Sequence, residues 1–379
     1  WRQRIIKGKS EDYFVPLCNF NAWIVADVAA DDGEEITRKI AIAGQLATGQ
    51  KLPEIEIEAD EFEAMKWPVA LWGARVSIEP IKNASNLLRA AMQRLSVNMD
   101  DRRMLTHTGW TVINGERVFL HANGAIGSKH VNVGLPRNLR NYSLPKDDTI
   151  DPVVAMRASI DLQDVAPARV SMPLWASMFL APLSEIITPV FVVSVEGGSG
   201  SLKSSYTAVM LNHYGSGFSE YAMPADWLGT ANSLEKLCFH AKDIPLVIDD
   251  LRPSTNQNEK RQIDEAVSRI TRAAGNRQGR SRLDANSEFR REYVPRGVVL
   301  MTAERKALGK SVNSRIITLD VEPGDIDSLM LSQCQAQRHI YSYAMKGYIE
   351  WVKQNWNELS TLLPTQAAEI RASNSVLGQ

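Results

Sequence analysis

The sequence has little cysteine and no cysteine motif. Cys18, Cys238 and Cys334 are the three cysteines among 379 residues, and they lie far apart in the chain. No CxxC pair occurs, and no cysteine lies in a cluster with histidine, which argues against a structural zinc site and against a disulfide framework. A reducing compartment fits this pattern best, so we expect a cytoplasmic protein.

An excess of charge of one sign is also lacking. The chain has 43 Lys and Arg residues against 44 Asp and Glu residues, so its formal net charge is −1. A uniformly basic nucleic-acid binder would show in this total. Any contact with DNA or RNA must therefore come from local segregation of charge.

Long uninterrupted apolar runs are absent as well. The most apolar stretch, 172–195, is broken by three prolines and by Glu185. This argues against a membrane span and for a buried helix followed by a buried strand. The chain begins with Trp1, and no basic segment followed by an apolar one opens it. We expect a piece of a longer polypeptide without a signal peptide or a membrane partner.

Residues 1–150 have the pattern of an α+β N-terminal module. Helical spacing predicts a helix over 83–95 with Asn83 as its N-cap. Asn114-Gly115 predicts the turn of a hairpin over 109–124. Short β-like runs separated by turns predict strands at 22–26, 39–43 and 54–60. No catalytic spacing is recognisable in this module.

Residues 160–322 alternate apolar runs with helical stretches. Such runs are typical of strands that are buried on both faces of a parallel sheet. We expect an α/β domain in which helices flank a central parallel sheet. The expected strands are 190–195, 245–248, 297–301 and 316–319, and the expected helices are 203–214, 233–241 and 258–274. Residues 323–379 predict a C-terminal helical segment with one stripe formed by Ile340, Ala344, Tyr348 and Trp351.

A loop rich in glycine and serine directly follows the first of these strands. Small residues let backbone N–H groups wrap the phosphates of a nucleotide, and the N-terminus of the next helix favours their charge. Lys203 would bind the β- and γ-phosphates and Ser204 would bind Mg²⁺, so we expect ATP and Mg²⁺ as ligands. The usual pattern has glycine where Leu202 stands, and a merely flexible loop is the alternative. The expected nucleotide-binding residues are Gly197, Gly198, Ser199, Gly200, Ser201, Leu202, Lys203, Ser204 and Ser205.

Two carboxylates end the second expected strand. Asp249 would bind Mg²⁺, and Asp250 would orient or deprotonate the attacking water. Many ATPases of this sort have glutamate at the second position, so Asp250 is a shorter version. A turn or helix-capping Asp pair is the alternative, but the strand, the spacing and the glycine-rich loop agree on a P-loop ATPase.

Two further polar residues flank the last expected strands. Thr302 ends the third strand, where it could sense the γ-phosphate and help to hold the attacking water; a structural threonine is the alternative. Arg315 precedes the fourth strand, where an arginine typically projects into the nucleotide of a neighbouring subunit. A surface salt bridge is the alternative for Arg315.

The Arg-rich segment, residues 266–296, contains eight arginines and three acidic residues and so has a local charge of +5. In a ring, this segment would face the pore, where Arg277, Arg280 and Arg282 could bind a phosphodiester backbone. A solvated basic face or a network of salt bridges between subunits is the alternative. Few aromatic residues interleave with these arginines, so base stacking is not indicated.

The order of these motifs resembles the AAA+ (MCM-like) ATPase module of replication helicase-primase proteins from plasmids, phages and staphylococcal cassette elements. The resemblance covers about 160–379 and rests on VEGGSGSLKSS, WLGTANSLEKL, PLVIDD, RAAGNRQGRSR, VVLMTAE and NSRIITLDV. It implies a hexameric ring that translocates on DNA in a bacterial or phage-infected cell. By the same resemblance, Lys203 and Ser204 match Walker A, Asp249 and Asp250 match Walker B, Thr302 matches sensor 1, Arg315 matches the arginine finger, and Arg338 matches a second sensor.

Two functions of different classes fit the sequence. The first is an ATP-driven, ring-forming DNA helicase, with a primase or an initiator elsewhere in the full-length protein. The second is an assembly or clamp ATPase that binds ATP and partners without unwinding, which Leu202 and the short Asp250 favour slightly. A small-molecule kinase is disfavoured, because Arg315 and the long basic segment would have no role in a monomer.

Overall fold

The computed structural model describes residues 2–6, 9–13, 16–279, 282–283, 289–307 and 309–377. The chain divides into two units, Trp1–Leu105 and Thr106–Gln379. The boundary therefore lies at residue 105 and not at residue 150. Residues 106–150, expected in the N-terminal module, belong to the second unit.

The first unit is built on a four-stranded mixed sheet in the order β5-β4-β3-β6, in which only β6 is parallel to its neighbour. Alternation along β3 and β4 places Ile24 and Ile42 in a core with Trp67, Trp72 and Met92. Asn83 is the N-cap residue of α3, as predicted, but it has left-handed backbone (φ 63°) and makes no side-chain capping bond. The elements are β1 (Arg2–Ile6), β2 (Lys9–Tyr13), β3 (Phe20–Asp31), β4 (Ile36–Leu46), β5 (Lys51–Glu58), α1 (Ala59–Ala64), α2 (Trp67–Trp72), α3 (Ala84–Leu95) and β6 (Asp100–Leu105).

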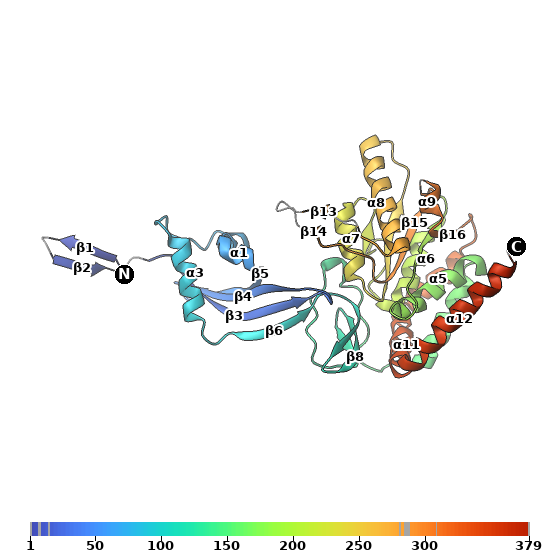
Figure 1. Cartoon of the computed structure of the whole chain (residues 1–379), viewed down its shortest axis with the longest axis horizontal. Helices are drawn as coiled ribbons and strands as arrows, with labels where there is room; N and C mark the ends of the chain where they lie inside the picture. The colour runs from blue at the N-terminus through green and yellow to red at the C-terminus, as the bar shows by residue number, and fades with distance from the viewer. Residues whose placement is uncertain are drawn as a thin grey trace. The chain divides into compact units, whose positions relative to one another are not determined.

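The second unit contains a five-stranded parallel sheet in the order β11-β12-β15-β10-β16. Figure 1 labels two of its strands, β15 and β16. Its strands are β10 (Val192–Glu196), β11 (Ala225–Asp226), β12 (Pro245–Leu251), β15 (Val298–Ala303) and β16 (Ile316–Asp320). Every residue of β10 and β15 is buried, as expected of strands covered on both faces. The predicted α/β class with a parallel sheet is confirmed for this unit.

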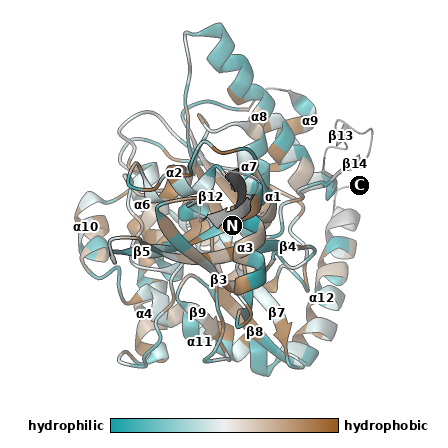
Figure 2. Cartoon of the chain, turned by 90° about the vertical axis from the view of Figure 1, so that its left-hand side faces the viewer, coloured by the Kyte–Doolittle hydropathy of each residue, from teal (hydrophilic) through white to brown (hydrophobic). Residues whose placement is uncertain are grey.

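Helices connect these strands and cover the sheet. Figure 2 shows much of α8 as hydrophilic, whereas its buried stripe includes Ile263, Val267 and Ile270. The helices are α4 (Pro152–Asp161), α5 (Ala168–Leu180), α6 (Lys203–Leu211), α7 (Ala231–His240), α8 (Gln257–Asn276), α9 (Lys310–Asn313), α10 (Ser328–Ala336), α11 (Tyr341–Gln354) and α12 (Trp356–Leu377). Short 3-10 helices are η1 (Arg137–Leu139), η2 (Leu162–Val165), η3 (Ala181–Leu183) and η4 (Asn212–Tyr214).

The C-terminal part of the chain is helical, as α10, α11 and α12 show, and the predicted stripe on α11 is only partly buried, with Ala344 buried and Tyr348 packed against the core. Trp351 is 49% exposed. The buried face instead contains Tyr341, Met345, Ile349 and Val352. Within the described ranges, no helix is both long enough and apolar enough to cross a membrane.

A hairpin of β7 (Gly109–Ile113) and β8 (Glu116–His121), followed by β9 (Gly124–Ile126), opens the second unit. Asn114 (φ 51°) and Gly115 (φ 83°) both have positive φ, as the predicted two-residue turn requires.

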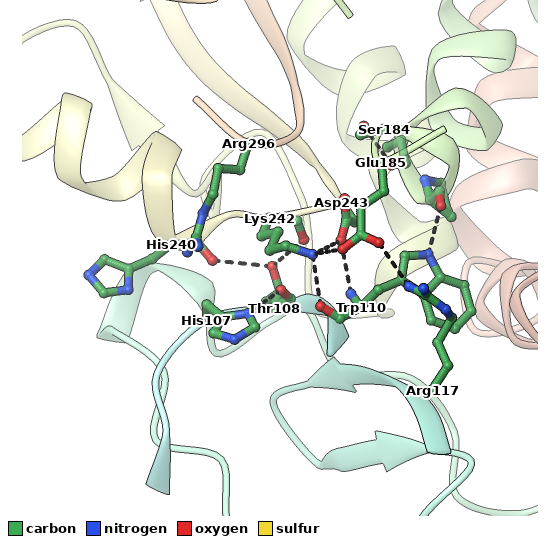
Figure 3. A network of polar contacts seen from close by, with 12 residues as sticks. His107, Thr108, Trp110, Arg117, Ser184, Glu185, His240, Lys242, Asp243 and Arg296 are labelled. Carbon is green, nitrogen blue, oxygen red and sulfur yellow. Dashed lines mark hydrogen bonds and ion pairs between the residues drawn. The ribbon is translucent and has the colours of Figure 1, made fainter. Parts of the chain in front are cut away.

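A buried polar network fastens β7 to the loop before β12 (Figure 3). Lys242 Nζ donates to Trp110 O (2.7 Å), to Glu185 Oε1 (2.5 Å) and to Asp243 Oδ2 (2.5 Å), and Trp110 N also donates to Asp243 Oδ2 (2.9 Å). A Cβ at Gly109 would lie 2.3 Å from Lys242 O, so only glycine allows this approach. Burial raises the pKa of Asp243 to about 6 although Lys242 opposes the shift. These contacts explain why residues after 105 belong to the second unit.

Candidate functional site

The glycine-rich loop joins the carboxyl end of β10 to α6. Gly197 N donates to Ala303 O (3.0 Å), which ties the loop to the end of β15. A Cβ at Gly197 would lie 2.7 Å from Val321 O and 2.8 Å from Ser201 Oγ, so this position requires glycine. Leu202 is the N-cap of α6, and Lys203 is its first residue. The N-terminus of α6 therefore begins directly where the loop ends.

The loop can accept a phosphate group. Gly198 and Gly200 have open space where a Cβ would stand, and Gly200 has φ 79°. Ser201 Oγ is buried and has no hydrogen-bond partner among the described residues. Open backbone, an orphaned hydroxyl and the start of a helix form the cradle that phosphates need. The residues present fit a nucleotide.

Asp249 joins the loop to the neighbouring strands. Ser204 Oγ, in the first turn of α6, donates to Asp249 Oδ1 (2.9 Å), and Thr302 Oγ1 donates to the same oxygen. Thr302 is fully buried at the end of β15. The three side chains come from one helix and two parallel strands, and hydroxyl and carboxylate oxygens are ligands that Mg²⁺ accepts. Ser204 and Asp249 thus fit the metal.

Asp250 is set apart from Asp249 by its backbone. It has φ 62°, and the register of β12 against β15 shifts between Ile248 and Leu251. Asp250 N donates to Thr302 Oγ1 (3.0 Å), while Arg252 lies 3.4 Å from Asp250 Oδ2. Burial raises the pKa of the Asp250 carboxyl; Arg252 lowers it, and Asp249 raises it further.

Lys203 is buried, and its contacts lie within the loop region. Its Nζ donates to Gly198 O (3.3 Å) and lies 3.8 Å from Glu304 Oε1. Glu304 follows β15 by one residue and was not among the predicted site residues. A strand-end acid two residues after Thr302 is the signal that could have drawn attention to it.

Leu202 adopts φ 62° and ψ 12°, the left-handed region that glycine enters freely. An L-residue with a Cβ is about 1–2 kcal/mol less stable there. The Leu202 side chain packs against the main core of the second unit, which offsets this strain. The departure from the usual glycine therefore preserves the backbone of the loop.

This strain predicts an unusual order of stability at residue 202. Leu202→Gly and Leu202→Ala both lose the packing of the leucine side chain, but only glycine adopts the left-handed backbone without strain. The free energy of unfolding of L202G should therefore be about 1 kcal/mol higher than that of L202A. In the right-handed helix α6, Ala208→Gly should lower stability by a similar ~1 kcal/mol. The unfolding midpoint of each full-length variant measures both effects. An L202A as stable as L202G would contradict the assignment.

Arg315 lies at the amino ends of the strands, whereas the loop follows the carboxyl end of β10. Val192 N, at the start of β10, donates to Arg315 O (2.9 Å), and β16 runs parallel to β10 from there. The guanidinium binds Asn276 Oδ1 (3.0 Å) and Ser311. A Cβ at Gly275 would lie 2.4 Å from Arg315 Cδ, so glycine lets Arg315 lie against α8. Arg315 cannot reach the glycine-rich loop of its own chain.

The structure separates the arginines of the Arg-rich segment. Arg277 is half-buried and donates to Pro295 O, and burial lowers its pKa, so it is not a freely exposed cation. Arg280 lies outside the described residues, and only the backbone of Arg282 is described, in the short pair β13 (Arg282–Leu283) and β14 (Phe289–Arg290). Arg296 stacks on Phe239 of α7, 3.6 Å from the ring centre.

The remaining predicted positions contribute less to the site. Arg338 is exposed between α10 and α11. Ser199 is exposed in the loop, and Ser205 lies half-buried in the first turn of α6. In the described part of the chain, no group of three or more His, Cys, Asp or Glu side chains could hold a metal ion. A Mg²⁺ site here would therefore depend on Ser204, on Asp249 and on phosphate oxygens.

Comparisons with known proteins agree with this fold. A family model described as "Domain of unknown function (DUF927)" matches residues 72–292. The chain is similar to a solved structure described as "SCCmec type IV Cch - active helicase", with a TM-score of 0.54 and 16% identity over 98% of this chain and 67% of that one. At this identity the likeness shows the fold alone.

Two further solved structures are more distantly similar and carry no argument. One is a JCV helicase, with a TM-score of 0.33 and 12% identity over 58% of this chain and 62% of that one. The other is the C-terminal region of NrS-1, with a TM-score of 0.32 and 8% identity over 87% of this chain and 68% of that one. No curated protein matches the chain.

Proposed function

Because this chain belongs to the family described as "Domain of unknown function (DUF927)", and that description assigns no activity, we propose its function from the site. The chain is the ATP-hydrolysing, ring-forming DNA helicase core of a mobile-element replication protein, of the AAA+ (MCM-like) type. The observation that carries this proposal is the meeting of Ser204, Asp249 and Thr302 beside the glycine-rich loop. The fold that the chain shares with the cassette helicase agrees with it.

Phosphate binding follows from the loop and from α6. Backbone N–H groups of residues 198–200 and the N-terminus of α6 surround the phosphates, and Lys203 neutralises the β- and γ-phosphates. Ser204 and Asp249 hold Mg²⁺, which neutralises charge on the phosphate oxygens when bound. Thr302 orients Asp249 through their shared hydrogen bond.

Asp250 is the residue that takes the proton of the attacking water. Its pKa is raised by burial, which makes its carboxylate a stronger base than an ordinary aspartate. The left-handed backbone of Asp250 sets its side chain apart from that of Asp249. Asp249 can therefore bind the metal while Asp250 acts as the base. The hydrogen bond from Asp250 N to Thr302 couples this base to the end of β15.

Arg315 acts on the nucleotide of a neighbouring copy. It directly precedes β16, at the amino ends of the strands and away from its own loop, and β16 pairs only with β10 among the described strands. A charge supplied in this way completes the site only when copies assemble, and the closed assembly is a hexameric ring. Arg338 is a second sensor in this scheme.

The Arg-rich segment binds single-stranded DNA in the pore of the ring. The segment runs from the second half of α8 to the residues before β15, and Thr302 of the site lies on β15. ATP turnover at Asp249 and Thr302 can therefore move the segment. Arg280 and Arg282 make the phosphate contacts. Arg277 instead fixes the base of the segment through Pro295. A primase or an initiator elsewhere in the full-length protein is the expected partner in the cytoplasm.

A clamp that binds ATP without unwinding is the second candidate. The observation that favours it is the ion pair between Lys203 and Glu304. In this pair the Lys203 ammonium group, which the phosphates need, already has an anionic partner. The two candidates differ in one measurement, the ATP-dependent separation of a forked DNA duplex. A helicase separates the strands, whereas a clamp binds ATP and DNA and leaves the duplex intact.

A further inference from the structure

Glu304 is a third carboxylate at the phosphate site, in addition to Asp249 and Asp250. It directly follows β15, and its backbone N donates to Leu251 O at the end of β12 (2.9 Å). The preceding residue, Ala303, accepts from Gly197 N at the start of the loop. Glu304 is thus fixed by backbone contacts at the point where the loop, β12 and β15 meet.

The side chain of Glu304 faces the cation of the loop. Its Oε1 lies 3.8 Å from Lys203 Nζ, and the two side chains are 28% and 9% exposed. Lys203 is buried and Glu304 is partly exposed, so this ion pair is screened less than one between two fully exposed side chains.

The same ammonium group is required by two anions. Lys203 Nζ contacts one carbonyl oxygen, Gly198 O, and one carboxylate, that of Glu304. A nucleotide diphosphate or triphosphate in the loop would present several negative oxygens to the same group. When a nucleotide binds, Lys203 contacts either both Glu304 and the phosphates or the phosphates alone. In both cases the nucleotide binds more weakly than it would without the Glu304 carboxylate.

We propose that Glu304 is the resident counter-ion of Lys203 and that the β- and γ-phosphates of the nucleotide must compete with it, which makes Glu304 a positioning residue that sets nucleotide affinity. The inference rests on the proposed nucleotide site and deepens it. Glu304 holds the ammonium at the mouth of the loop, next to the base Asp250. It keeps Lys203 in place at the expense of affinity, so the nucleotide is released more readily after turnover.

The test is the affinity of the full-length chain for Mg-ADP and Mg-AMP, measured by calorimetry on the wild type, E304Q and D250N. Glutamine keeps the shape of Glu304 and removes its charge. E304Q should bind Mg-ADP about tenfold more tightly, since one competing ion pair is lost. Mg-AMP has no β-phosphate to meet Lys203, so its affinity should change less than about twofold. D250N removes a charge that does not contact Lys203, so its affinity for Mg-ADP should rise less than that of E304Q.

The double variant K203A/E304Q separates competition from simple repulsion. Without the ammonium group, removing Glu304 should improve Mg-ADP binding by less than about threefold over K203A alone. E304Q with wild-type affinity, or an equal gain in both backgrounds, would overturn the role of Glu304. A wild-type chain that binds no nucleotide would instead contradict the proposed function, so the two failures are distinguishable.

Discussion

Replacing Lys203 by alanine is expected to reduce ATP hydrolysis by about 10²–10³-fold or more, because the only buried ammonium group at the described phosphate site is lost. The chain should still fold, since Lys203 contributes one hydrogen bond and one ion pair at the loop. Steady-state phosphate release by the full-length chain, with single-stranded DNA present, measures the effect. Unchanged turnover would contradict the assignment of the loop.

Lys203→Arg is the matched control for this loss. Arginine keeps the charge, but its planar group is larger than the ammonium, and Lys203 is almost fully buried. K203R should therefore remain strongly impaired while its unfolding midpoint stays near that of the wild type. A variant in which activity and stability fall together would point to a structural role of Lys203.

Arg315→Ala is expected to reduce ATP hydrolysis by about 10³-fold and leave nucleotide affinity nearly unchanged. Arg315 lies at the amino end of β16 and cannot contact the loop of its own chain, so its effect must come from a neighbouring copy. Turnover and Mg-ADP affinity, measured on the same preparation, separate the two effects. Loss of binding together with turnover would argue for a defect within the chain.

Mixing two inactive variants tests the shared site directly. An interface between the intact loop of an R315A chain and the intact Arg315 of a K203A chain has every required group. Equimolar mixing should therefore restore part of the wild-type turnover, whereas either variant alone stays inactive. If the mixture remains as inactive as its components, Arg315 does not act between copies.

The sheet of the second unit could be predicted from sequence because its strands are nearly continuous apolar runs. Val192–Val195 and Val298–Met301 are buried on both faces, and that burial leaves a direct compositional trace. The acids and hydroxyls at the strand ends follow from the same pattern, because parallel strands bring their carboxyl ends to one edge.

The domain boundary and the role of Glu304 could not be predicted in the same way. Residues 106–150 join the second unit through Asp243 and Lys242, which are distant in sequence and carry no local signal. Glu304 faces Lys203 only because β15 lies next to β10 in the sheet. The left-handed Leu202 was visible as a departure from the glycine pattern, but its backbone angle required the structure.

The stripe on α11 shows the limit of helical periodicity. Four residues with suitable spacing, ending at Trp351, predicted one stripe, of which Ala344 is buried. The packing of α11 against α4 instead buries the neighbouring stripe with Tyr341 and Ile349, and Trp351 stays half exposed. Two adjacent apolar stripes on one helix cannot be distinguished without knowledge of what covers them.

The most direct test of the central claim is ATP-dependent separation of a forked DNA duplex by the full-length chain. The account predicts strand separation with Mg-ATP, none with a non-hydrolysable ATP analogue, and none with K203A under either condition. A wild-type chain that hydrolyses ATP at a normal rate and binds the fork, yet leaves the duplex intact, would contradict the helicase assignment and favour the clamp.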